Sequence, residues 1–171
     1  MKKKIFILLF LAFYLSVSCF QLLLAEVIFI EIDDTAFISK AVSLTNAEDL
    51  QAFTYESYRF AVFKENEEIK FFIISTDYSQ ITGYRGKTTL GIILKEDMTV
   101  ESIEIIDSED TRGYVRRITS MGFTQRFENY RQGDEIEIIT GATLTSKAII
   151  DTLNECMEVF EKIVREFGIE N

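Results

Sequence analysis

The sequence predicts an α+β domain, in which an antiparallel sheet packs against helices, preceded by one N-terminal membrane span. Three observations lead to this fold class: an uncharged stretch near the N-terminus, β-rich runs separated by charged turns, and a long amphipathic helix at the C-terminus. We expect residues 1–30 to be a membrane anchor or signal segment and residues 31–171 to form one extracytoplasmic domain. A chain of 171 residues has room for both.

The N-terminal segment has the pattern of a single membrane span. Lysines occupy positions 2–4, and the run from Ile5 to Ala25 carries no charged side chain. About 20 apolar residues cross the hydrocarbon core, and flanking positive charge favours the cytoplasmic side. We therefore predict a single-pass protein of the cell membrane with a cytoplasmic N-terminus and an extracytoplasmic C-terminal domain. A cleaved signal peptide and a lipoprotein modified at Cys19 are the alternatives.

Short elements are expected before and after the sheet. Residues 44–50 are expected to form a helix with Thr45 or Asn46 as its N-cap, since both side chains can accept a hydrogen bond from the first helical turn. Beyond the main strands, residues 114–127 are expected to be helical and residues 135–139 to form one more short strand.

Four β-rich runs predict the sheet itself. Residues 58–63 and 69–75 flank one charged turn, and residues 87–95 and 99–106 flank another. Short runs of this kind on either side of a polar turn are typical of β-hairpins. The middle of the chain is therefore expected to be an antiparallel sheet of about four strands.

The last helix is the clearest predicted element. Apolar residues recur at steps of four and three from Ile149 to Phe167, which is the stripe of an amphipathic helix that needs a partner surface. Together with the strands, this stripe predicts helices packed on one face of the sheet. Cys156 lies on the stripe, so a small buried hydrophobe is favoured over a redox thiol.

Composition excludes several kinds of chemistry. The chain has no His, no Pro, no Trp and only two Cys, and its formal net charge is −10. Catalytic triads and zinc sites that depend on histidine are therefore excluded, and two cysteines do not hold an iron–sulfur cluster by themselves. The negative charge argues against nucleic acid as a partner. Redox or group-transfer chemistry would have to use carboxylates, hydroxyls, amines or an imported cofactor.

The candidate site lies where the segment at 135–139 meets the last helix. Residues 137–147 read EIITGATLTSK, so two small residues precede a helix start rich in hydroxyl groups. Gly141 and Ala142 let a ligand approach the backbone, and a helix N-terminus offers unpaired N–H groups to an anion. This arrangement predicts a phosphate site. The alternative is that the hydroxyl groups only cap the helix while Gly141 makes the turn. The glycine spacing of a P-loop is missing.

Four motifs in order resemble one known family. Residues 140–146 (TGATLTS) resemble the S/T-G-A-T-x-T/S motif of the FMN-binding domain, found in the G subunit of Rnf electron-transport complexes and the C subunit of Na⁺-translocating NADH:quinone reductases. Upstream, residues 83–86 (GYRG) match its G-Y-x-G motif, and residues 110–113 (DTRG) stand where E-T-P-G is usual. Residues 123–127 (FTQRF) are similar to its F-x-x-Q-F, and the whole resemblance covers roughly residues 80–150.

The resemblance implies a covalent cofactor. In that family a flavin transferase joins a threonine hydroxyl of the motif to the FMN phosphate, and the corresponding residue here is Thr143. It further implies an electron carrier that relays electrons within an Rnf- or Nqr-type ion-translocating oxidoreductase, with other membrane subunits as partners. No catalytic residue or metal ligand of its own is implied. The residues implied to bind FMN are Thr140, Gly141, Ala142, Thr143, Leu144, Thr145, Ser146, Lys147, Tyr84, Asp110 and Thr111.

Three positions differ from the family pattern. Asp110 and Arg112 replace the usual Glu and Pro, and Glu137 replaces the commoner Asp six residues before the acceptor. We expect the local geometry to depart most at Arg112, where a rigid turn residue is lost. Two other functions stay open: a stand-alone extracytoplasmic FMN electron-transfer protein or lipoprotein, and a flavin-free binding or sensor module of the same fold.

Overall fold

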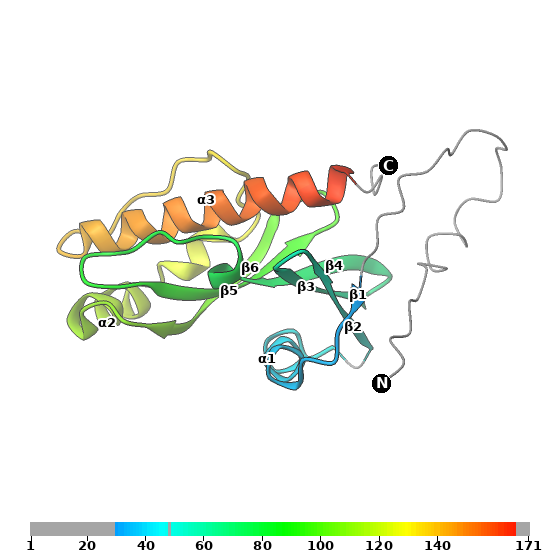
Figure 1. Ribbon diagram of the computed structural model, residues 1–171. Helices are drawn as coiled ribbons and strands as arrows, with labels where there is room; N and C mark the ends of the chain where they lie inside the picture. The colour runs from blue at the N-terminus through cyan, green and yellow to red at the C-terminus, as the bar shows by residue number, and fades with distance from the viewer. Residues whose placement is uncertain (1–29, 48, 167–171) are drawn as a thin grey trace, which may run out of the picture.

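The computed structural model describes residues 30–47 and 49–166, which form an α+β domain (Figure 1). Within these residues, six strands pair in chain order into one antiparallel sheet, so the α+β class is confirmed. The elements are β1 (Ile30–Glu31), α1 (Thr35–Thr45), β2 (Leu50–Tyr55), β3 (Tyr58–Glu65), β4 (Glu68–Ile74), the 3₁₀ helix η2 (Ser75–Asp77), β5 (Thr88–Lys95), β6 (Val100–Ser108), α2 (Arg112–Ser120), the 3₁₀ helix η3 (Thr124–Phe127) and α3 (Thr143–Glu166).

Both predicted hairpins are confirmed. Strands β3 and β4 are joined by a two-residue turn at Asn66 and Glu67, whose φ angles are 52° and 69°. Two positive φ angles give the turn a twist that matches that of the strands. Strands β5 and β6 pair around a turn that contains Met98, with φ 61°. The sheet is larger than the four strands expected, because β2 pairs with β3 and β1 pairs with β2.

The prediction of a helix over residues 44–50 is wrong. Helix α1 begins nine residues earlier, at Thr35, where the Asp34 side chain accepts hydrogen bonds from the N–H groups of Ala36 and Phe37. Thr45 is its last residue, and Asn46 ends it in a left-handed conformation with φ 53°. Asparagine tolerates this conformation better than most residues, so it stops the helix here instead of starting one.

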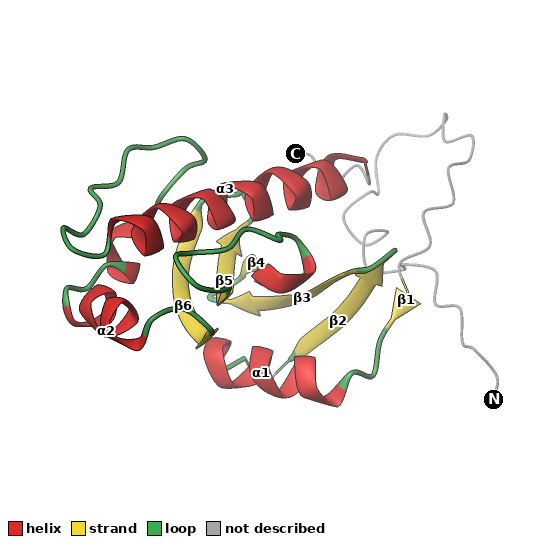
Figure 2. Ribbon diagram, turned by 60° about the vertical axis from the view of Figure 1, so that its left-hand side comes forward, coloured by secondary structure: helices red, strands yellow, loops and turns green. Residues whose placement is uncertain are grey.

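The sheet is covered on both faces, so the expectation of helices on one face is also wrong. Neighbouring side chains on a strand point to opposite sides. Phe71 accordingly joins the large core cluster under α3, whereas Phe72 joins a smaller cluster with Phe37 and Ala41 of α1. Figure 2 shows α3 and α1 on opposite sides of the strands.

The connection between β6 and α3 differs from its prediction in two places. Helix α2 ends at Ser120, followed by Gly122 with φ 61° and by η3, so residues 114–127 are not one continuous helix. The predicted strand at 135–139 is irregular. Side chains bind the backbone of this segment at its middle and its last residue: Arg126 donates to the Glu137 carbonyl oxygen, and the Ser146 hydroxyl accepts from the Ile139 N–H. These contacts take the place of a strand ladder.

Helix α3 matches its prediction over the described residues. Its buried side chains include Ile149, Leu153 and Phe160, while Phe167 lies outside the described residues. Cys156 is fully buried, and burial raises the pKa of its thiol above the usual value. The thiol is therefore protonated at neutral pH, and Cys156 acts as a small core residue.

Residues 1–29 of the predicted anchor, Cys19 included, lie outside the described residues, and Ile30, its last residue, begins β1. Across residues 30–47 and 49–166, no helix combines the length and the apolar character that crossing a membrane requires.

The packing of Phe160 generates a stability prediction. Its fully buried ring lies 5.3 Å from Phe71, 5.6 Å from Phe60 and 6.1 Å from Tyr78, measured between ring centroids. Phe160→Ala should lower the free energy of unfolding by about 3–5 kcal/mol, since it leaves a cavity between the sheet and α3. Urea denaturation followed by circular dichroism measures this change. Lys162→Ala, on the exposed side of the same helix, should have little effect, and equal effects of the two substitutions would contradict the described packing.

Candidate functional site

The motif segments come together at one end of the molecule. The loop before β5, the connection from β6 to α2 and the turn before α3 lie side by side there, with α2 next to the first turn of α3 (Figures 1 and 2). Phe123 and Phe127 of the FTQRF segment are fully buried in the main core. The other three motifs meet around a single carboxylate.

That carboxylate belongs to Asp110, which is 5% exposed. It accepts a hydrogen bond from the Thr145 hydroxyl at 2.7 Å, and three more from the backbone N–H groups of Thr111 at 2.6 Å and of Tyr84 and Arg85 at 3.1 Å each. The donors come from the GYRG loop, from the start of α2 and from α3. Asp110 therefore holds three distant parts of the sequence in one arrangement.

The two glycines of the GYRG loop allow this close approach. A Cβ atom at Gly83 would lie 2.4 Å from the Asp110 carboxylate oxygen Oδ2, and one at Gly86 would lie 2.5 Å from the Cβ atom of Glu109. Both distances are shorter than a side chain can accept. The loop also closes on itself, since the Gly83 N–H donates to the Gly86 carbonyl oxygen at 2.8 Å. Glycine at both positions is thus required for the loop to pack on Glu109 and Asp110.

Opposing effects act on the charge of Asp110. Burial alone would raise the pKa of its carboxyl, but the hydrogen bonds from Thr145, Thr111, Tyr84 and Arg85 outweigh burial and hold the pKa below its usual value. A carboxylate that accepts several N–H and O–H bonds is favoured in its charged form. Asp110 is therefore ionised at neutral pH, and its charge is stabilised by neutral hydrogen-bond donors from its own chain.

Among the described residues, no side chain accepts a hydrogen bond from the first N–H groups of α3. Ala142, which precedes the helix, accepts the first helical hydrogen bond from Ser146 but has no side-chain acceptor to offer. The Thr145 hydroxyl is bonded to Asp110, and the Ser146 hydroxyl donates to the Ala142 carbonyl oxygen. The capping alternative is therefore wrong for these two hydroxyl groups, while Gly141 does make the turn with φ 81°. The N–H groups of the first turn remain available to a ligand.

Thr143 is the exposed hydroxyl residue at the start of α3, in contrast to the buried Thr145 and Ser146. Leu144 beside it is 57% exposed, and Lys147 is exposed one turn further along. Thr140 is exposed before the turn, and its carbonyl oxygen accepts from Arg117 Nε at 2.7 Å. The helix start thus presents one accessible hydroxyl next to free backbone donors.

Two further predicted residues flank this helix start. Tyr84 is 52% exposed and packs edge-on against Tyr114 of α2, with ring centroids 5.7 Å apart. Among the residues that the structure describes, the buried hydroxyl oxygen of Thr111 has no hydrogen-bond partner. A buried polar atom without a partner is costly and is often satisfied by a bound molecule. Both side chains are therefore open to additional contacts.

A cavity of about 460 Å³ lies between β6 and α2. Its lining consists of Ile105, Ser108, Asp110, Arg112, Val115 and Arg116.

Arg112 is the first residue of α2, where proline is tolerated because its missing N–H has no partner within the helix. Arginine can adopt the same backbone conformation there, so the substitution mainly adds a charge.

Sequence reasoning missed Arg116 and Arg117 as residues of this end of the molecule. The signal was visible, since residues 111–127 contain four arginines and no acidic residue in a chain where acidic residues outnumber basic ones. Glu137, by contrast, was singled out, but its side chain is 91% exposed and lies 3.8 Å from Arg126.

Fold and site together define a small α+β domain with an uncapped helix N-terminus suited to a phosphate-bearing ligand. The model of one family, the FMN-binding domain, matches residues 83–158, a segment that runs from the GYRG loop into α3 and includes all four motifs. Residues 83–158 therefore match the FMN-binding domain family, as the motifs predicted, and this match supports FMN as the ligand of the site. A comparison with curated proteins yields no match to this chain.

The residues present fit an FMN group. The uncapped N–H groups of α3 suit its phosphate, and the partnerless Thr111 hydroxyl and the exposed Tyr84 ring are open to its ribityl and ring portions. Asp110 already has four donors from the protein, so its observed role is to position Tyr84, Thr111 and Thr145.

The Asp110 network generates a pH-dependent prediction. Asp110→Asn should lower the free energy of unfolding at pH 7 by about 1–2 kcal/mol, because the charged acceptor of four hydrogen bonds is lost. The folded pKa of Asp110 is depressed, so wild-type protein has this advantage above the unfolded pKa of about 3.9 and loses it as the pH falls through the folded pKa. Urea denaturation of both proteins between pH 7 and pH 3 measures the difference.

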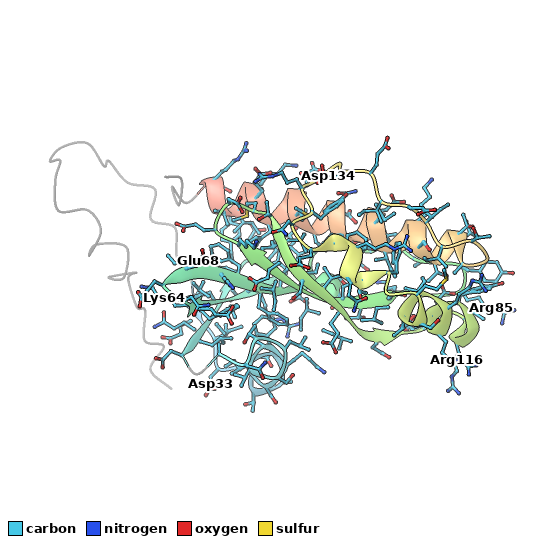
Figure 3. The ribbon with its side chains drawn as sticks, turned by 180° about the vertical axis from the view of Figure 1, so that it is seen from behind. Asp33, Lys64, Glu68, Arg85, Arg116 and Asp134 are labelled. Atoms are coloured by element: carbon cyan, nitrogen blue, oxygen red, sulfur yellow. The ribbon has the colours of Figure 1, made fainter. Side chains whose placement is uncertain are left out.

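The control for this experiment is Asp33→Asn, at an exposed position far from the site (Figure 3). It should have almost no effect at any pH. A difference between wild type and Asp110→Asn that stays constant down to pH 3 would show that the charge of Asp110 is not what stabilises the network.

Proposed function

We propose that this chain is a membrane-anchored flavoprotein that carries FMN covalently on Thr143 and relays electrons within an Rnf- or Nqr-type ion-translocating oxidoreductase. The observation that carries the proposal is the exposed Thr143 hydroxyl at the uncapped start of α3, within the segment that matches the FMN-binding domain. A separate flavin transferase would attach the cofactor during maturation.

The position of Thr143 suits a phosphodiester. Such a linkage keeps one negative charge, which the N–H groups of the first turn and the positive end of the helix dipole stabilise. Gly141 and Ala142 place little bulk before the helix, and the exposed ammonium group of Lys147 lies one turn along it. These residues hold the phosphate, while Thr140 and Leu144 lie exposed on either side of the acceptor.

Neighbouring residues would orient the rest of the cofactor. Tyr84 offers an exposed aromatic face supported by Tyr114, and Thr111 offers a buried hydroxyl group without a partner in the described part of the chain. Thr145 and Ser146 are occupied by Asp110 and by the turn, so their role is to fix the helix start. Bound FMN supplies one-electron redox chemistry that the chain's own side chains lack.

The membrane context follows from the N-terminal pattern. Three lysines followed by an uncharged run through Ala25 favour a retained anchor with the FMN-binding domain outside the cytoplasm. An electron carrier held at the membrane surface is suited to exchange with other membrane subunits. The second candidate is a stand-alone extracytoplasmic flavoprotein or lipoprotein with the same cofactor.

Thr143→Val should abolish covalent flavin without unfolding the domain, because the exposed side chain loses only its hydroxyl group. The protein is produced and exported in a host that contains the flavin transferase, and tryptic peptides are analysed by mass spectrometry for an added FMN phosphoryl group. Thr119→Val removes an exposed hydroxyl of α2, outside the motif, and should retain full modification. Covalent FMN on the Thr143→Val protein would reject the assigned acceptor, and wild-type protein without flavin absorbance would favour a flavin-free binding or sensor module.

Membrane association and partners are tested on the wild-type chain. We expect the protein to stay in the membrane fraction after washing with high salt and carbonate, and to co-purify with integral membrane subunits after mild detergent extraction. N-terminal sequencing then distinguishes a retained anchor from cleavage or lipidation at Cys19. Recovery of a flavinylated protein that is free of other subunits would favour the stand-alone flavoprotein.

A further inference from the structure

One end of this acidic protein is positively charged. Five exposed cationic side chains lie there and take part in no ion pair with another described residue: Arg85, Arg112, Arg116, Arg117 and Lys147. We call this group the basic end. It stands out because the chain has 28 acidic and only 18 basic residues.

The five charges come from three different elements that contact one another. Arg85 in the loop before β5 lies over the ring of Tyr84, which packs against Tyr114 of α2. Arg117 of α2 donates to the Thr140 carbonyl oxygen and so reaches the turn before α3. Figure 3 shows Arg85 and Arg116 at the same end of the molecule, opposite Lys64 and Glu68.

Nearby carboxylates reduce this charge without cancelling it. Asp110, Glu109 and Asp151, which is one turn along α3 from Lys147, set three negative charges against five positive ones. The carboxylate of Asp110 is buried and bonded to four donors of its own network, so it is not free to pair with the arginines. Glu109 is exposed at the edge of the group. Between Thr111 and Phe127 the chain has no acidic residue at all.

We infer that the basic end is a docking surface for the acidic face of a partner protein. The rest of the chain is strongly acidic and repels such a face, so electrostatic attraction favours an approach that brings the partner against the basic end. Arg112 and Arg116 also line the open cavity beside β6, which gives the surface a concave region. The partner would then face the end that presents Thr143, which is useful to an electron carrier; this last point rests on the proposed function.

An anionic membrane surface is the competing occupant. Strand β1, where the described chain begins, lies toward the opposite end of the domain from α2 (Figure 1). If the predicted anchor precedes β1, the basic end points away from the lipid. The position of β1 therefore favours a protein over lipid headgroups, whereas charge alone suits both.

The test uses the full chain in nanodiscs of uncharged phosphatidylcholine and a plant-type ferredoxin as a small acidic probe. Binding is measured by microscale thermophoresis at low salt and again at about 200 mM salt, where screening should weaken it. Arg85→Glu/Arg116→Glu should weaken binding at low salt roughly tenfold, since two exposed charges are reversed. Arg85→Gln/Arg116→Gln, a milder pair, should give a smaller loss in the same direction.

The matched control is Lys40→Glu/Lys64→Glu, which changes the net charge equally; Lys40 belongs to α1 and Lys64 to β3, both away from the basic end (Figures 2 and 3). It should leave affinity nearly unchanged. Equal losses from both reversed pairs, or no loss from either, would overturn the docking surface. Binding to phosphatidylglycerol vesicles that depends on Arg85 and Arg116, without binding to ferredoxin, would assign the surface to a membrane and reject a protein partner. None of these binding measurements requires bound flavin. Mass spectrometry of the same samples, which detects covalent FMN, therefore tests the proposed function separately.

Discussion

The buried carboxylate of Asp110 is the interaction on which the rest of the site depends. It joins segments that are 25 to 35 positions apart in the sequence, and its donors include two backbone N–H groups of the GYRG loop and the Thr145 hydroxyl of α3. A buried charge is tolerated only when it is well bonded, and this one is stabilised by hydrogen-bond donors that must all be in place together. The first turn of α3 is thereby held against the start of α2, and Thr143 is presented on a fixed backbone.

The core decides where this network can form. Helix α3 is anchored along its length by rings from the sheet, with Phe160 packed against Phe60 and Phe71. The other face of the sheet is closed by α1, so all the central strands are covered. Because the axis of α3 is set by this packing, its N-terminus meets the end of β6, which is where Asp110 emerges.

Much of the fold could be predicted from local pattern. The hairpins and α3 have strong periodicity and turn signals of their own, and they were confirmed. The helix over residues 35–45 was missed, although Asp34 is a common N-cap residue and the apolar Phe37 and Ala41 follow it at a helical spacing. Residues 135–139 alternate like a strand, but Arg126 and Ser146 bind their backbone in place of a neighbouring strand, which local pattern does not reveal.

The sequence by itself determined the match to the FMN-binding domain and the position of the TGATLTS motif, because order and spacing of short motifs are properties of the chain. It also determined that no histidine chemistry is available. Tertiary structure alone decided that Thr145 and Ser146 are buried while Thr143 is exposed, and that Asp110 positions the site. It also decided that arginines from α2 and the GYRG loop share one end of an acidic molecule. The physical reason is that burial, hydrogen bonding and electrostatic potential depend on which distant segments the core brings together.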